Sequence, residues 1–342
     1  MDLIYMNTDK EELGALQTYD FDLAFGEDEN NFELKLATEN HCCEAGYYIF
    51  IDGTEYGGIV DDIQVNTEKN EVTYSGRTWH GTLGSKIILP LQPGDKFPGE
   101  VTVKLDDENG SFSNRYLVIS GNAHDCMRCI LIRAGLDTLF KVSTDAAPKD
   151  IVGYQFDRYT DVYSGFRKML KSVGLKLCVT FKNGFVELSA VEQYDFSQDE
   201  EFTPDGISFI LKRKYKTVNH LICLGSGELA DRMVVHLYAD ESGTISQNQT
   251  LTGMDEYTAV FDYPNVESEE ELISSGKDRL KSLWAQNNLS ISFDPNDDIY
   301  DLGDIVGAYD NVTRAAVVAE IVKKIVRVQN GIVTISYKVG EK

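Results

Sequence analysis

The segment 47–60 reads YYIFIDGTEYGGIV, which indicates a β-hairpin: an apolar run, an Asp-Gly pair and a second run rich in apolar residues. Asp-Gly in this position is a strong hairpin signal, because both central residues of a type I′ turn need positive φ angles. Two more such dipeptides, Asn183-Gly184 and Asn330-Gly331, also separate apolar runs. Three hairpins spread along the chain predict a fold dominated by antiparallel strands.

Further strand patterns surround the first hairpin. Residues 19–25 (YDFDLAF) and 31–36 (NFELKL) alternate apolar and polar side chains with a period of two, and residues 71–79 (EVTYSGRTW) are expected to form another strand. We expect one small antiparallel sheet here, closed or nearly closed into a barrel. A second β-rich region follows Pro204, with a hairpin within 218–238 and a strand meander over 289–339.

Three segments instead show the apolar spacing and end signals of helices: from Asn122 or Asp125 to about Phe140, from a Thr160 cap to Gly174, and about 268–286 after the capping box Ser268-Glu269-Glu270-Glu271. The first two helices are followed by the hairpin at 175–191. Together they predict a small α+β unit in the middle of the chain.

Turn-forming residues divide the chain after the first β-rich region, since three of the seven prolines lie between residues 90 and 98. We therefore expect a β-rich α+β protein of several domains, in which two small β-barrel-like domains flank an α+β domain. The expected bounds are 1–95 for the first barrel-like domain, 96–205 for the α+β domain, and 206–342 for the second barrel-like domain with its one helix. The barrels can be discontinuous in sequence.

The chain is strongly acidic: its 342 residues include 56 Asp and Glu against 32 Lys and Arg, for a formal charge of -24. Proteins that wrap nucleic acid neutralise phosphates with a surplus of basic residues, so this class is excluded. No apolar run reaches the ~18 residues of a membrane helix. The first residues carry no signal-peptide pattern either, so we expect neither membrane insertion nor export.

The six cysteines are expected to be reduced and mostly buried. Cys126 and Cys129 form a Cys-x-x-Cys pair with His124 just before it, which is compatible with a redox pair or with half of a metal site. A structural zinc site needs a second ligand pair, and the other histidines are dispersed. Packing of both thiols on one helix face in the core is therefore the favoured interpretation.

Two other motifs are weaker. Gly225-Ser226-Gly227 lacks the remaining residues of a phosphate-binding loop, so a hairpin loop is favoured. Asp294, Asn296 and Asp298 resemble the start of a calcium-binding loop, but the expected glycine and closing glutamate are absent. We therefore expect no cofactor and assign no metal ligand.

One basic run stands out in this acidic chain, and it consists of Lys212, Arg213, Lys214 and Lys216 around Tyr215. It could contact a nucleic-acid backbone, or it could be a solvated strand face. Because the net charge opposes nucleic-acid binding, contact with an acidic neighbouring subunit is the preferred functional interpretation.

Five segments carry a family resemblance: 74–81 (YSGRTWHG) with Leu83 and 85–88 (SKII) after it, 218–229 (VNHLICLGSGEL), 234–240 (VVHLYAD), 298–307 (DIYDLGDIVG) and 321–325 (IVKKI). They resemble the tail-hub proteins of siphoviruses and prophages of Gram-positive bacteria. This resemblance implies a homotrimeric ring at the distal end of the phage tail, in the baseplate or tail tip. The implied partners are the tail tube or distal tail protein, the end of the tape measure, and a spike or fibre protein.

The resemblance also implies a virion protein that is made in the cytoplasm of the bacterial host and that DNA passes without specific binding. Longer members append a peptidoglycan hydrolase; since this chain ends just after its last strand, we expect no enzyme. A cell-wall carbohydrate-binding module and, less favoured, a cell-wall hydrolase remain as alternatives. No catalytic constellation is present in the sequence.

Within the resembling segments, Gly76, Arg77, Trp79, His80 and Gly81 are interpreted as a structural motif at a barrel corner. The glycines would allow close backbone approach, Trp79 would pack, and Arg77 or His80 would complete local hydrogen bonds. If the chain forms a hub ring, part of its acidic surplus is expected to line the inner wall, with Lys212 to Lys216 away from it.

Overall fold

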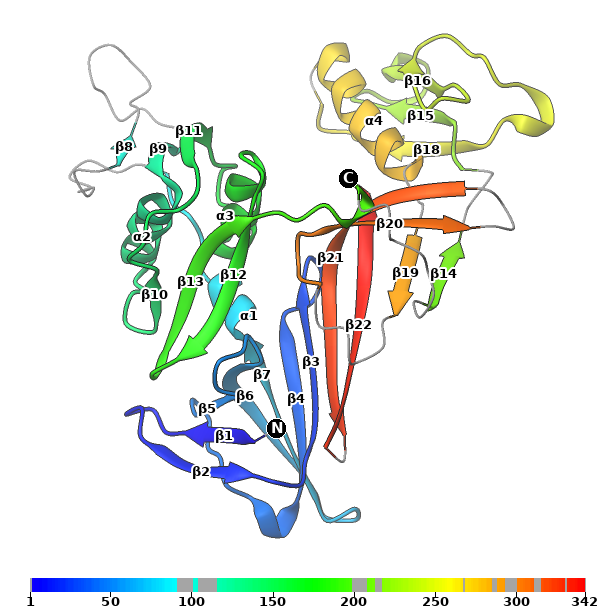
Figure 1. Cartoon of the computed structure of the whole chain (residues 1–342). Helices are drawn as coiled ribbons and strands as arrows, with labels where there is room; N and C mark the ends of the chain where they lie inside the picture. The colour runs from blue at the N-terminus through cyan, green and yellow to red at the C-terminus, as the bar shows by residue number, and fades with distance from the viewer. Residues whose placement is uncertain are drawn as a thin grey trace. The chain divides into compact units, whose positions relative to one another are not determined.

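The computed structural model describes residues 2–90, 101–103, 116–198, 208–212, 217–266, 268–284, 288–292, 300–310, 315–329 and 331–341 (Figure 1). The chain divides into two compact units. Unit 1 comprises Met1–Phe209 and Ser290–Gly340, and unit 2 comprises Ile210–Leu289. Unit 1 is therefore discontinuous, because its C-terminal strands return to it after the chain has passed through unit 2.

One large sheet dominates unit 1, with the hydrogen-bonded strand order β14-β19-β22-β21-β3-β4-β7-β6-β5-β1-β2 and β20 paired to β21. The N-terminal strands are β1 (Leu3–Met6), β2 (Glu12–Leu16), β3 (Asp20–Gly26), β4 (Asn31–Ala37), β5 (Tyr48–Phe50), β6 (Gly57–Asn66) and β7 (Glu71–Thr78). The later strands are β14 (Ser208–Lys212), β19 (Asn288–Ser292), β20 (Ile305–Asp310), β21 (Ala315–Gln329) and β22 (Ile332–Glu341).

The predicted alternation explains how this sheet is built. In β4, every second side chain is buried, starting with Phe32, and the intervening residues face solvent. β3 pairs with β4 on one side and with β21 on the other, so strands about 300 residues apart lie side by side (Figure 1). The period-two strands are thus confirmed, and the sheet joins both ends of the chain.

The three predicted hairpin turns differ in outcome. Asn183 and Gly184 both have positive φ, 54° and 75°, and join β12 (Leu175–Lys182) to β13 (Phe185–Glu192), as a type I′ turn requires. At 52–53 the hairpin is present but the turn prediction is wrong, because the connection between β5 and β6 spans residues 51–56 and only Gly53 has positive φ. For the third, Gly331 has φ 77°, while Asn330 lies outside the described residues.

The middle of the chain adds two small sheets and three helices to unit 1. The sheets are β10-β13-β12 and β11-β9-β8, with β8 (Thr102–Val103), β9 (Val118–Asn122), β10 (Phe140–Val142) and β11 (Asp150–Gln155). The helices are α1 (Trp79–Gly84), α2 (Ala123–Ala134) and α3 (Val162–Lys171). Short 3₁₀ turns lie at Thr38–Asn40 and Phe196–Gln198. A continuous cluster of buried side chains packs these helices against the sheets.

Several predicted boundaries need correction. α2 is capped by Asn122 but ends at Ala134 rather than near Phe140, because Gly135 takes a left-handed conformation that stops the helix. Asp161, not Thr160, caps α3 through a 2.8 Å bond from the Ser164 amide. Trp79 starts α1 instead of ending a strand.

Unit 2 is a four-stranded sheet covered on one face by a helix (Figure 1). Its strands are β15 (His220–Leu224), β16 (Val234–Ala239), β17 (Ile245–Ser246) and β18 (Thr258–Asp262), with 3₁₀ turns at Leu229–Asp231 and Gly253–Asp255. The helix is α4 (Glu269–Trp284), whose first turn donates the Glu271 amide to Ser268 Oγ at 3.2 Å, as the capping box predicts. Leu272 and Leu280 bury against Leu221 and Leu237 of the sheet.

The β-rich α+β prediction is confirmed, whereas closed barrels are not: in the described residues the large sheet runs from β14 to β2 without joining its ends. The bounds of the three predicted domains stay a prediction, because the division into two units is coarser. Among the described residues, no helix has the length and apolar character needed to cross a membrane.

Gly276 lets α4 lie close to its sheet, and we expect Gly276→Ala to destabilise the protein. A Cβ at this buried position would come within 2.6 Å of Cys223 Sγ and 2.7 Å of Leu237 Cδ1. Overpacking of this kind costs about 1–3 kcal/mol, which exceeds the ~1 kcal/mol that alanine gains in a helix. Denaturant unfolding measures the change, and Ser274→Ala on the exposed face is the control. Equal or greater stability of Gly276→Ala would contradict this packing.

Candidate functional site

The motif at residues 76–81 lies where β7 ends and α1 begins. Gly76 sits in the middle of the sheet, and a Cβ there would lie 1.9 Å from the backbone oxygen of Ile59 in β6. At Gly81 a Cβ would lie 2.1 Å from the backbone oxygen of Asn30. Both positions therefore require glycine because another backbone segment occupies the space of a side chain. Thr78 caps α1, its Oγ1 accepting from the Gly81 amide at 3.2 Å.

Arg77 forms a two-pronged ion pair with Asp61 across a bulge in β6. Nε and Nη2 of Arg77 donate to the two carboxylate oxygens at 2.7 Å each, and the Arg77 amide donates to the same carboxylate at 3.1 Å. These bonds lower the pKa of Asp61 and raise the pKa of Arg77. These hydrogen bonds from Arg77 hold the bulge in β6 in place. Next to this bulge, the backbone of Ile59 lies close to Gly76.

Trp79 is fully buried and stacks on Phe181 of β12, with ring centroids 5.2 Å apart and an angle of 14° between planes. Phe50 of β5 packs on the same Phe181 ring at 4.0 Å. Through these rings, the motif connects the N-terminal strands with the α+β part of unit 1. The indole Nε1 has no hydrogen-bond partner among the described residues.

His80 is buried between aromatic rings and also lies near a carboxylate. It stacks on Phe25 at 4.5 Å and meets the edge of Tyr163 at 5.3 Å, while its Nε2 lies 3.6 Å from a carboxylate oxygen of Glu55. Burial lowers the pKa of His80 to about 3, with further lowering by the charges of Arg167 and Lys324. The imidazole is therefore neutral at physiological pH, and Nδ1 has no hydrogen-bond partner among the described residues.

Glu55 forms an ion pair with a lysine from the C-terminal part of the chain. Lys324 of β21 is 5% exposed and donates to Glu55 Oε1 at 2.9 Å, with its ammonium also near the rings of Tyr56 and Tyr337. Burial opposes the charge of Lys324, but Glu55 and these tyrosines raise its pKa above the ordinary value. The neutral imidazole and this ion pair form one buried structural centre.

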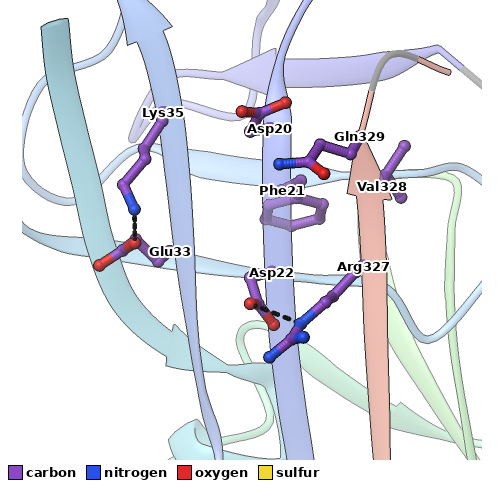
Figure 2. A pocket seen from close by; sticks show the side chains of 8 residues that line it. All are labelled: Asp20, Phe21, Asp22, Glu33, Lys35, Arg327, Val328 and Gln329. Atoms are coloured by element: carbon purple, nitrogen blue, oxygen red, sulfur yellow. Dashed lines mark hydrogen bonds and ion pairs between the residues drawn. The ribbon is translucent and has the colours of Figure 1, made fainter. Parts of the chain in front are cut away.

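A polar hollow of about 220 Å³ lies on the sheet face of β3, β4 and β21 (Figure 2). Its buried floor includes Phe21 and Val328, and its polar lining consists of Asp20, Asp22, Glu33, Lys35, Arg327 and Gln329. Lys35 pairs with Glu33, and Arg327 Nε donates to Asp22 Oδ2 at 3.0 Å (Figure 2). A small charged ligand would have to compete with these pairs, and no residue predicted as a site lies here.

The Cys126-x-x-Cys129 pair lies on α2, with both side chains buried, so the core-packing interpretation is confirmed. Burial raises the pKa of Cys126 to about 12, which makes its thiolate inaccessible at neutral pH. Both ring nitrogens of His124 are used: Nδ1 donates to the Asp145 carbonyl at 2.7 Å and Nε2 accepts from the Ala190 amide at 2.8 Å. His124 therefore fixes the position of β13 relative to α2.

Of the remaining predicted sites, one lies in a described loop, and the other two lie wholly or mostly outside the described residues. Residues 225–233 connect β15 to β16, which confirms the hairpin loop at Gly225-Ser226-Gly227. Asp294, Asn296 and Asp298 lie outside the described residues, as do Arg213, Lys214 and Lys216, and Lys212 is the last residue of β14. Subunit contact by this basic run stays a prediction.

Two clusters were not predicted from the sequence. In unit 2, His220 Nδ1 lies 2.6 Å from Glu256 and its Nε2 lies 2.8 Å from Nδ1 of His236 on the neighbouring strand. In unit 1, Cys42 and Cys43 place their sulfurs 3.5 Å apart beside Tyr74. The adjacency of the two cysteines was the only sequence signal for the second cluster, while the first depends on the register of β15 and β16.

The sequence and the fold of this chain were compared with those of known proteins. No protein-family model matches the chain, and no curated protein sequence matches it. Among solved structures, the 43 kDa tail protein of prophage MuSo2 from Shewanella oneidensis superposes with a TM-score of 0.50 and 11% identity, covering 100% of this chain and 98% of that one. The two chains share a fold over their whole length.

Two further structures are similar at a lower score. The tail protein from Neisseria meningitidis MC58 gives a TM-score of 0.49 at 10% identity, covering 100% of this chain and 96% of that one. A prophage tail protein from Listeria monocytogenes EGD-e gives 0.48 at 11% identity, covering 100% and 95%.

We expect Gly76→Ala to destabilise unit 1 by about 2 kcal/mol or more, because the added methyl group would overlap a backbone oxygen that cannot rotate away. Denaturant unfolding followed by circular dichroism measures the effect. Ser75→Ala, one residue earlier in β7, is the matched control and should change the unfolding free energy little. Similar stability of the two variants would contradict the close approach of β6 to β7.

His80 should make the protein sensitive to acid. The folded state holds this imidazole neutral with a pKa of about 3, whereas the unfolded chain protonates it near its ordinary pKa of 6.5, so stability is lost as the pH falls below 6.5. The loss attributable to His80 is about 2 kcal/mol at about pH 5. His80→Phe should remove it, so the free energies of unfolding of variant and wild type should diverge between about pH 7 and pH 5. Parallel pH profiles would exclude this role.

Proposed function

We propose that the chain is a structural protein of a phage or prophage tail. The observation that supports this most is the shared fold, over essentially the whole of both chains, with a protein described as a prophage tail protein. The sequence resemblance to tail-hub proteins points the same way. The side chains that could carry chemistry support a non-catalytic role as well, since His80, His124 and Cys126 are each committed to packing or to hydrogen bonds inside unit 1.

The more specific form of the proposal is a hub. In it, the chain assembles as a homotrimeric ring at the distal end of the tail and joins the tail tube or distal tail protein to the tape-measure end and to a spike or fibre. The hub position, the trimeric state, the partners and the Gram-positive siphovirus group all rest on the sequence resemblance alone. The protein would be made in the host cytoplasm and carried in the tail tip of the virion.

In a hub ring, part of the net charge of -24 would help DNA to pass through the channel. An anionic inner wall would repel a DNA backbone within about a Debye length, ~8 Å at physiological salt, so that DNA passes without binding. The basic run beginning at Lys212 would then lie away from the channel, against an acidic surface of a neighbouring subunit.

The alternative of a carbohydrate-binding module would be favoured by exposed aromatic rings lining a groove. In the polar hollow on β3, β4 and β21, the aromatic residue is Phe21, whose side chain is 1% exposed. No specific observation therefore favours carbohydrate binding over the tail role.

The position in the virion can be tested with an antibody against this chain. We expect gold-labelled antibody to mark the distal tail end of particles from the source phage or induced prophage, and negative-stain microscopy of the purified protein with its tail-tube partner to show rings. Labelling along the tube would refute the hub position and leave the tail role standing, whereas labelling on the capsid would refute the tail role as well. Particles that lack the protein altogether would refute both.

A further inference from the structure

The loop between β4 and β5 holds two adjacent thiols against a buried tyrosine. Cys42 and Cys43 follow the 3₁₀ turn at Thr38–Asn40, and their Sγ atoms lie 3.5 Å apart, within hydrogen-bond distance for sulfur. Tyr74 of β7, which is fully buried, accepts from the Cys42 amide at 3.1 Å and from the Cys43 amide at 3.4 Å. Its hydroxyl also lies 2.6 Å from Nδ1 of His41. The backbone of the pair is thus hydrogen-bonded to a buried side chain of β7.

The two thiols are not equivalent. Cys42 is partly accessible, whereas Cys43 is fully buried. The hydrogen bond from the Cys43 thiol lowers the pKa of Cys42 despite the opposing effect of burial, with a further lowering from hydrogen bonding to Tyr74. The same bond and burial raise the pKa of Cys43 far above its ordinary range. Of the two thiols, the partly accessible Cys42 therefore loses its proton first, and Cys43 keeps its proton.

We propose that Cys42 and Cys43 form a thiol site that reacts with hydroperoxides, in which Cys42 is the nucleophile and Cys43 the resolving thiol. A partly accessible cysteine that ionises more readily than its neighbours, next to a second thiol, is the arrangement typical of peroxide-sensitive cysteines. The proposal concerns chemistry outside the tail role and does not depend on it.

The reaction balances in two steps. The Cys42 thiolate attacks one oxygen of hydrogen peroxide, an S–O bond forms, the O–O bond breaks, and hydroxide leaves to give the sulfenic acid of Cys42. The Cys43 sulfur then attacks the Cys42 sulfur, an S–S bond forms, the S–O bond breaks, and water leaves with the Cys43 proton. The two sulfurs together lose two electrons and the peroxide gains them, so one peroxide yields two molecules of water after protonation of the hydroxide.

The geometry also predicts that the product is reversible. The sulfurs must move from 3.5 Å to the ~2.05 Å of a disulfide. Adjacent Cα atoms are about 3.8 Å apart across a trans peptide bond, below the usual ~4.4–6.8 Å between bridged cysteines. A strained disulfide has a more oxidising potential, so thiol reductants should open it readily.

The other cysteines provide a matched comparison. Cys178 of β12 is also partly accessible, but burial raises its pKa, so it keeps its proton at neutral pH. Burial likewise raises the pKa of Cys126 and of Cys223, to about 12 and about 11. Cys178 therefore matches Cys42 in accessibility and differs from it in the direction of its pKa shift.

The test uses the full chain, limiting hydrogen peroxide and tryptic peptide mapping by mass spectrometry. Cleavage at Lys35 and Lys69 yields a peptide that contains Cys42 and Cys43 and no other cysteine. We expect this peptide to lose two hydrogens in the wild type and to regain them with dithiothreitol. In Cys43→Ser the sulfenic acid should instead be trapped by dimedone at residue 42, and in Cys42→Ser residue 43 should stay reduced.

A second measurement needs no variant. Iodoacetamide labelling of the native wild type should modify Cys42 faster than Cys178, because the thiolate is the reactive form and the pKa is lowered at Cys42 but raised at Cys178. Equal labelling rates, or peroxide oxidation of Cys178 before the Cys42 peptide, would overturn the proposal. Oxidation of Cys42 without disulfide formation in the wild type would overturn the resolving role of Cys43.

Discussion

The ion pair between Lys324 and Glu55 is the contact on which the arrangement of unit 1 depends. It joins β21 to the loop between β5 and β6, at a separation of 269 residues, and both side chains are largely withdrawn from water. Removing one partner of a buried pair leaves an uncompensated charge, at a cost of about 3–5 kcal/mol. Glu55 also lies beside His80, and Lys324 adds to the lowering of the His80 pKa, which is caused mainly by burial and then by Arg167.

Further ion pairs attach the same C-terminal segment to other parts of the unit. Glu320 of β21 pairs with Lys171 of α3 at 2.5 Å, and Lys176 of β12 pairs with Asp304 at 2.8 Å. Lys323 reaches Glu29 in the connection between β3 and β4 at 2.5 Å. These contacts explain why the chain returns to unit 1 after unit 2: the hydrogen bonds of β21 to β3 set the register, and the charges select which partners β21 faces.

The sequence predicted what depends on neighbouring residues. The period-two strands β3 and β4, the Asn183-Gly184 turn and the Ser268 cap each follow from local chemistry, and each is present in the structure. The Asp52-Gly53 turn failed for a tertiary reason. The Gly53 amide donates to the Phe181 carbonyl at 2.9 Å and the Phe181 amide donates to the Thr54 carbonyl at 2.8 Å, so this loop pairs with β12 instead of closing tightly.

The site could be anticipated only in part for the same reason. The motif at 76–81 was identified as structural, but its partners Phe181, Glu55 and Lys324 come from three distant segments, and nothing local distinguishes Glu55 among 56 acidic residues. His220 and His236 looked dispersed because their contact depends on strand register. Cys42 and Cys43 are adjacent in sequence, yet the tyrosine that holds them lies about 30 residues further on.

The buried ion pairs also indicate where the surplus of negative charge lies. Lys323 and Lys324 each enter the interior with a carboxylate partner, so these two pairs are neutral and contribute nothing to the surplus of -24. Buried charges must be paired, whereas unpaired carboxylates are tolerated only where water solvates them. The acidic surplus therefore belongs to the surface of the folded chain. In a ring of several copies, surfaces of this sign would repel one another unless basic groups lie at the contacts, which makes the location of the basic run at 212–216 the deciding electrostatic feature of any assembly.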